Sequence, residues 1–263
     1  MSLRKTKKQA QPESKIYIGS KVFDVFLILF MLILSVIFLY PFLNVVATSL
    51  SSNRMITTGQ VTFFPRELMV DGYKMLFKEQ NILGAYWNTI VIAVGTMVIS
   101  LSLTSLMAYV MMVPDFVLRK QLSVFLLITM FFSGGMIPTY LVVSKLHLID
   151  TFWAMVIPSA MGVWNVILTK TYIQSSIPLE IYESASIDGC SDWKYFTRMV
   201  FPLSKPIIAV MVLLYAVGKW NDFFSGLIYL NDSAKQPLQM TLRNILVMSD
   251  SFGINMNLAE QMN

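Results

Sequence analysis

Few side chains in this sequence could act as catalysts or as metal ligands. Cys190 is the only cysteine and His147 is the only histidine, so the sequence predicts no internal disulfide and no cysteine-based metal site. It contains neither the G-x-x-x-x-G-K-S/T loop that binds nucleotide phosphates nor the H-E-x-x-H pattern of zinc hydrolases. The sequence therefore predicts no catalytic residue, no cofactor and no metal, and His147 is interpreted as an ordinary loop residue.

The segment 173–205 gathers charged and small residues between two apolar runs. Its residue order predicts a helix, a sharp turn and a second helix. Ser176 can cap the first helix and Pro178 suits its opening turn, while Gly189 can adopt the positive φ that ends a helix. We therefore expect two short helices joined at Gly189.

The second short helix is expected to begin at Ser191 or Asp192 and to end at Pro202. Small side chains around the turn would let the surface of another protein approach closely; they are Ser184, Ala185, Ser186, Gly189 and Cys190. An amphipathic connector lying on a membrane surface explains the pattern equally well. The residues by themselves leave both interpretations open.

Membrane-spanning helices must position this segment. Hydrophobic residues make up 56% of the chain and charged residues only 13%, about half the share that is usual in soluble proteins. Four runs contain no Asp, Glu, Lys or Arg, namely 25–53, 80–114, 121–144 and 151–169, and a fifth apolar run starts at 206. Crossing ~30 Å of hydrocarbon takes about 20 helical residues, and lipid offers the backbone no other hydrogen-bond partner. The sequence predicts an all-α membrane protein with five spans.

The expected spans are 23–47, 87–112, 122–143, 152–172 and 207–227. The third is interrupted by Gly134, Gly135 and Pro138. Lys219 and Asp222, three residues apart, are expected on one helical face near the far end of the fifth span.

Spans one to four carry no ionisable residue near their middle, whereas ion-coupled carriers usually have one there. Their polar groups are uncharged and suit a neutral, hydroxyl-rich solute. The candidates for lining a solute path are Asn88, Asn165, Trp220 and Asn221. Hydrogen bonding between helices is an equally good explanation for any one of these polar residues.

The basic N-terminus sets the expected orientation, because cytoplasmic flanks of spans carry an excess of Lys and Arg. Residues 1–21 are interpreted as a cytoplasmic tail, 22–48 as the first span, 49–82 as an extracytoplasmic segment and 83–263 as the main transmembrane domain. The net charge of +5 reflects this topology. No basic stripe with interleaved aromatic residues is present, so we expect no nucleic-acid binding.

One stretch of this domain resembles a known family. Glu183-Ser-Ala-Ser-Ile-Asp-Gly-Cys, followed at fixed spacing by Met199-Val-Phe-Pro, resembles the E-A-A-x-x-x-G…I-x-L-P loop of the permease subunits of binding-protein-dependent ABC importers. The stretches that start at Ser176, Trp87 and Trp220 resemble the carbohydrate-uptake branch, and within it the second permease of maltose-type systems. The departures, such as Ser184 and Cys190 for Ala, keep size or apolarity.

The resemblance implies the type I ABC importer permease fold and a non-catalytic subunit of the bacterial plasma membrane. It implies that the loop docks into a separate ATPase; the residues assigned to this coupling loop are Glu183, Ser184, Ala185, Asp188, Gly189 and Pro202. The implied partners are a second permease, two ATPase subunits and an extracytoplasmic sugar-binding protein. Solute would cross by alternating access.

Members of that family usually have a sixth span, and residues 231–263 contain no apolar run long enough to form one. The sequence therefore predicts five spans of an expected six, with the last span missing. Two alternatives remain beside a sugar importer: a secondary, ion-coupled carrier, and a truncated permease that does not transport.

Overall fold

The computed structural model describes residues 18–78, 81–114 and 116–248. This part of the chain is helical and contains no strand, as the sequence predicts. The chain divides into two compact units, residues 1–78 and 79–263. The division falls close to the expected boundary at 82/83.

The first unit is dominated by α1 (Ile18–Ser49), a single helix that continues through Pro41. Most of its apolar side chains between Val22 and Val46 are exposed, which is typical of a helix solvated by lipid; Ala47, near its end, is buried. Two short helices follow, α2 (Asn53–Thr57) and α3 (Asp71–Lys78). The amide of Asn44 donates to the carbonyl of Thr62 at 2.9 Å, which folds the segment after α2 back onto the end of α1.

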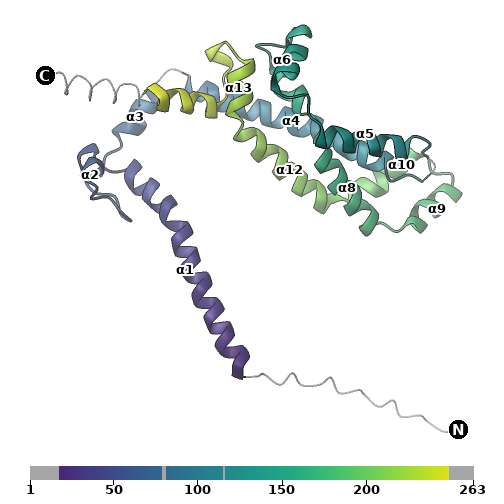
Figure 1. Ribbon diagram of the computed structural model, residues 1–263, viewed down its shortest axis with the longest axis horizontal. Coiled ribbons are helices and arrows are strands. Elements are labelled where there is room, and N and C mark those ends of the chain that lie inside the picture. The colour runs from purple at the N-terminus through teal and green to yellow at the C-terminus, as the bar shows by residue number, and fades with distance from the viewer. Residues whose placement is uncertain (1–17, 79–80, 115, 249–263) are drawn as a thin grey trace. The chain divides into compact units, whose positions relative to one another are not determined.

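The second unit is built around α4 (Ile82–Val110), which packs against α12 (Lys205–Trp220) and α8 (Val163–Ser176) (Figure 1). One face of α4 is buried, and most of its residues are small or hydroxyl-bearing; they include Ala85, Thr89, Thr96, Ser100, Thr104 and Ala108. Such side chains let helix backbones approach closely in lipid. This face therefore forms the centre of the bundle.

Two of the expected spans are bent. The third consists of α5 (Arg119–Phe131) and α6 (Met136–Lys145), which meet at 114° across a break that includes Gly135 with φ +86°. The fourth consists of α7 (Phe152–Val156), a 3-10 turn η1 (Ile157–Ser159) and α8, bent by 54°. In the described residues two helices are long and apolar enough to cross a membrane. By length and composition up to five spans result if each of three bent pairs counts as one, the third pair being Asp192–Leu203 with α12, bent by 79°.

The fifth span differs from the prediction. Instead of running on to residue 227, α12 ends at Trp220, and Asp222 caps a separate helix, α13 (Phe223–Tyr229). Lys219 and Asp222 do pair, at 2.8 Å between Nζ and Oδ2, but they do so across this junction. Asp222 also accepts the backbone N–H of Ser225 at 3.0 Å. Its side chain therefore caps the N-terminus of α13, so that a new helix starts where α12 has ended.

Beyond α13, a 3-10 turn η3 (Ser233–Lys235) leads into a helical stretch over residues 238–248. The backbone N–H of Leu238 donates to the hydroxyl of Thr89 at 2.8 Å. This bond ties the segment to the first turns of α4. Part of the stretch in which no sixth span was expected, residues 249–263, lies outside the described residues.

Candidate functional site

The loop between α8 and α12 forms a chain of short helices. They are α9 (Leu179–Ile187), α10 (Asp192–Tyr195), a π-helical turn η2 (Phe196–Val200) and α11 (Phe201–Leu203). The prediction of a helix, a turn and a second helix is confirmed. The assignment of Ser176 as a cap is wrong, because Ser176 is the last residue of α8 and Pro178 precedes the first turn of α9.

The turn between α9 and α10 has the expected backbone. Gly189 has φ +72°, and the N–H of Cys190 reaches back to the carbonyl of Ala185 at 2.9 Å. Such a closing bond needs a residue in the left-handed backbone conformation. Glycine adopts this conformation without the steric penalty that a Cβ would impose. A Cβ at Gly189 would meet no atom within 4 Å, so the turn faces open space.

The second short helix runs further than predicted. Pro202 does not end it but lies inside α11, and the helical path stops only at Ser204. The preceding π-helical turn explains this, because its i→i+5 bond from the N–H of Phe201 to the carbonyl of Phe196 widens the turn. A widened turn can accommodate a ring that lacks an N–H and would otherwise crowd the carbonyl four residues earlier.

The predicted coupling residues divide into two groups. Glu183, Ser184, Asp188 and Gly189 are exposed along α9 and its turn, and Pro202 is exposed in α11. Ala185 is only 5% exposed and packs inward. Its small size therefore serves the packing of α9 against the bundle, while its neighbours present the outer surface.

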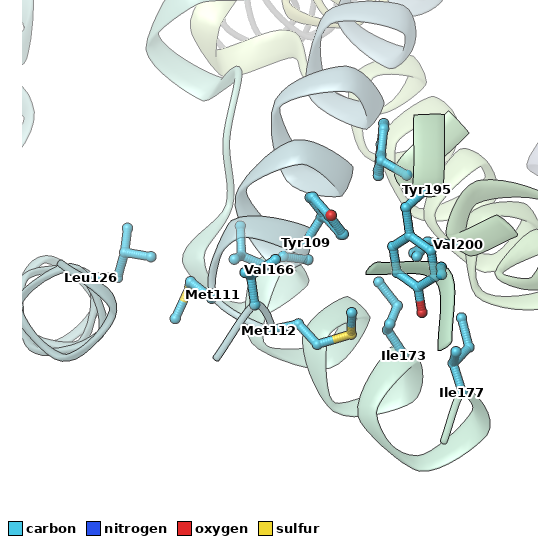
Figure 2. Packing of buried hydrophobic residues seen from close by; sticks show 13 residues of the cluster. Tyr109, Met111, Met112, Leu126, Val166, Ile173, Ile177, Tyr195 and Val200 are labelled. Carbon is cyan, nitrogen blue, oxygen red and sulfur yellow. The ribbon is translucent and has the colours of Figure 1, made fainter. Parts of the chain in front are cut away.

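A buried cluster holds the loop to the bundle (Figure 2). Tyr195 and Val200 from the loop pack with Tyr109 from α4 and with Ile173 from α8, and all four are at least nine-tenths buried. Rings add to the contact, with Tyr109 and Phe196 at 5.2 Å between centroids. Because interiors packed in this way resist deformation, the loop is held firmly against α4 and α8.

Asp192 is a functional candidate that sequence reasoning did not select. It was considered only as a cap, and the hydroxyl of Tyr109 donates to its Oδ1 and to its carbonyl, both at 3.2 Å. Tyr182 donates to the same Oδ1 at 3.4 Å. Tyr109 precedes Asp192 by 83 residues, so no local pattern could have indicated the pair. These bonds fix the start of α10 to the end of α4.

The four candidates for a solute path have different surroundings in the described structure. Asn88 donates to the carbonyls of Ala234 and Gln236 at 2.8 and 3.2 Å, and the exposed Asn221 donates to its own helix at Val217. The remaining two are Trp220, which is 37% exposed, and Asn165, which is half-buried in the first turn of α8.

Asn88 does lie in the wall of a largely apolar pocket of about 440 Å³. Trp87 and Phe152 supply aromatic surface there, and Asp150 and Lys235 supply charge. The pocket lies where the first turns of α4 and α7 meet the segment after α13. None of the other three candidates lines it.

Asp150 organises the edge of this pocket. Its Oδ1 accepts the N–H groups of Asn231 and Asp232 at 3.2 and 3.1 Å, and Lys235 lies 2.9 Å from its Oδ2. The backbone bond from Asp232, followed by the bond from Lys235, holds the pKa of Asp150 below its usual value. The same carboxylate raises the pKa of Lys235. The pair ties the turn before α7 to the segment after α13.

The described part of the chain contains no group of three or more His, Cys, Asp or Glu placed to hold a metal ion. His147 lies in the turn after α6 with φ +54°.

The fold and the loop define a class of protein. Residues 97–256 match the family described as the inner membrane component of binding-protein-dependent transport systems. The chain belongs to this family, so the resemblance found in the sequence is confirmed, and the protein is a permease subunit of an ABC importer. A secondary carrier is not favoured.

Two related proteins and one solved structure show which members of this family the chain resembles. Protein LplC of Bacillus subtilis (strain 168) is 43% identical over 90% of this chain and 80% of its own length. The polygalacturonan/rhamnogalacturonan transport system permease protein YtcP of the same organism is 38% identical over 88% of this chain and 80% of its own. A crystal structure of a bacterial ABC transporter involved in the import of the acidic polysaccharide alginate matches with a TM-score of 0.82 at 28% identity, covering 88% of this chain and 82% of that one.

Proposed function

We propose that this subunit moves a sugar or oligosaccharide into the cytoplasm by alternating access, driven by ATP hydrolysis on separate subunits. The carbohydrate class is supported by the names of the relatives, which include permeases for polygalacturonan or rhamnogalacturonan and for arabinooligosaccharides. The ATP coupling is supported by one observation above all. The loop presents an exposed turn at Gly189, while its opposite face is packed against α4 and α8.

The proposed mechanism follows from this packing. An ATPase subunit that closes around ATP would grip the exposed side of α9, where Glu183 and Asp188 lie. The buried side of the loop would carry the displacement into the bundle. The loop also continues directly into α12 through a 79° bend at Ser204. Movement of the loop would thus rotate α12 relative to its neighbours, a rigid-body change of the kind that alternating access requires.

The partners in this proposal are a second permease, two ATPase subunits and a sugar-binding protein on the outer side. The permease itself would supply no catalytic group. It would be a multi-pass protein of the bacterial plasma membrane with its N-terminus in the cytoplasm.

A charge placed at the turn tests the coupling. Gly189→Asp should abolish ATP-dependent uptake by the reconstituted importer and the stimulation of its ATPase, because a carboxylate would occupy the space that the partner needs. Gly59→Asp is the matched control, since Gly59 also has positive φ (+67°) with no atom within 4 Å of a Cβ but lies in the first unit. Gly189→Asn, which tolerates positive φ without adding charge, should retain more uptake than Gly189→Asp. Normal uptake by Gly189→Asp would contradict the coupling role.

The solute path is tested by substitutions of its candidates. Asn165→Ala and Asn221→Ala should raise the KM for the transported sugar while the assembled complex stays intact. Asn88→Ala should instead reduce the amount of folded protein, because its amide already bonds two backbone carbonyls. An unchanged KM in both of the first two variants would remove them from the proposed path.

The orientation has its own test. In a Cys190→Ala background, a cysteine at Ser186 should react with a membrane-impermeant reagent only after permeabilisation, and one at Lys74 should react from outside. Both side chains are exposed. The reverse labelling pattern would overturn the proposed orientation while leaving the coupling test untouched.

A further inference from the structure

Three cations line one pocket at the end of the bundle that carries the coupling loop. Arg119 and Lys120 begin α5, and Lys170 belongs to α8; with Ser123 they surround a pocket of about 850 Å³. Arg119 and Lys170 are half-buried. Among the described residues, no acidic side chain lines the pocket and none of the three cations forms a salt bridge.

This arrangement is electrostatically unfavourable by itself. Like charges that share a partly buried space repel one another, and the repulsion is stronger than in bulk water because fewer water molecules screen it. Asp115 lies in the connection before α5 in the sequence, and counting its charge still leaves a net positive charge from these four residues. An anion bound in the pocket would relieve the repulsion.

The pocket opens onto an apolar groove. Lys120, Gln121, Val124, Phe125 and Ile128 line an adjoining hollow of about 470 Å³ along α5, and Lys120 and Val124 line both spaces. The exposed fractions of Val124, Phe125 and Ile128 are between 52% and 61%. From Lys120 to Ile128 the groove follows the helix for ~12 Å at about 1.5 Å per residue.

We propose that this combined site binds an anionic phospholipid. The phosphate of the headgroup would lie between Arg119, Lys120 and Lys170, and an acyl chain would lie along Val124 and Ile128. Charge complementarity selects an anion, and basic pockets between membrane-spanning helices are suited to anionic headgroups. The continuous apolar groove selects a lipid over a soluble phosphate or an acidic peptide, because neither of those needs an apolar surface beside the charge.

The site adjoins the coupling loop. Arg119 also lines a smaller pocket of about 190 Å³ whose other walls include Gln174 of α8 and Tyr182 and Tyr195 of the loop. A lipid phosphate that holds the guanidinium of Arg119 therefore acts beside the surface through which the loop packs. The lipid is expected to influence how firmly the loop is held, in addition to solvating the bundle.

Competition between two lipids tests the proposal. The purified full-length chain in detergent is mixed with equal amounts of phosphatidylglycerol and phosphatidylcholine of identical acyl chains, and the bound lipids are counted by native mass spectrometry. The wild-type chain should retain phosphatidylglycerol preferentially. Lys120→Gln, a change at an exposed side chain that should not affect folding, should lower this preference about fivefold, equivalent to ~1 kcal/mol per cation near a membrane surface. Arg119→Gln combined with Lys170→Gln should lower it about 25-fold if the two effects add.

The controls separate this site from general attraction to the surface. Lys205→Gln removes an exposed cation at the start of α12, outside the pocket, and should leave the preference unchanged. The double variant Val124→Ser/Ile128→Ser should weaken the binding of phosphatidylglycerol and should not increase the binding of phosphatidylcholine. Soluble glycerol phosphate should not compete. The proposal is overturned if the wild-type chain shows no preference, if the pocket variants keep it, or if glycerol phosphate displaces the lipid.

Discussion

The buried hydroxyl groups between α4 and α12 allow a sharp test of what holds the bundle together. Thr104 and Tyr215 share a hydrogen bond of 2.7 Å between their oxygens, and their side chains are 1% and 8% exposed. Thr96 lies eight residues before Thr104 on the same face of α4 and is equally buried, but its hydroxyl has no partner among the described residues. Thr→Val keeps the shape of the side chain and removes only the hydroxyl.

Thr104→Val and Thr96→Val should therefore change the free energy of unfolding by different amounts or in opposite directions. Thr104→Val leaves the hydroxyl of Tyr215 unpaired in a buried place, which costs about 1–3 kcal/mol in soluble proteins. Hydrogen bonds between membrane helices average ~0.6 kcal/mol and reach ~1.7. We expect Thr104→Val to lower the free energy of unfolding by about 1–2 kcal/mol. Thr96→Val should leave the free energy of unfolding unchanged or raise it, because the substitution removes a buried hydroxyl that makes no hydrogen bond.

The assay is unfolding of the purified chain in mixed micelles with increasing denaturing detergent, followed by tryptophan fluorescence. Combining Thr104→Val with Tyr215→Phe should cost less than the sum of the two single changes, since each change alone already breaks the bond. Equal effects of Thr104→Val and Thr96→Val, or strict additivity of the double variant, would refute the assigned role of this bond.

Two further predictions concern the outer turn and the contact between α4 and α7. A Cβ at Gly95 would clash with the ring of Phe152, so Gly95→Ala should destabilise the bundle in the same assay and Phe152→Leu should restore much of the loss; failure of the rescue would show that another contact is at fault. Asp150 has a lowered pKa, so its contribution to stability is complete above about pH 4, its unfolded value, and is lost as the pH falls through the lower folded value. The raised pKa of Lys235 makes its contribution complete below about pH 10.4 and lost as the pH rises through the folded value. Asp150→Asn should therefore flatten the acid side of the stability profile, and an unchanged profile would exclude this linkage.

The sequence by itself determined which apolar segments are helical and which turn is exposed. Lipid leaves the backbone no partner outside the helix, so the apolar runs had to be helical whatever their neighbours. The turn at Gly189 was equally predictable, because only local backbone geometry requires a residue without Cβ there. The loop pattern around it also indicated the family, which the comparisons confirm.

The tertiary structure decided how these helices bend and what their polar groups do. No simple sequence rule gives the 114° between α5 and α6, or the π-helical turn through which the helix passes Pro202. Ala185 was expected at the outer surface of the loop and lies on its inner face, since burial depends on which side of α9 meets α4 and α8. Packing also brings Arg119 and Lys170 to the wall of one pocket. Residues 51 positions apart come together only when α5 and α8 pack side by side, and that contact is a property of the folded bundle.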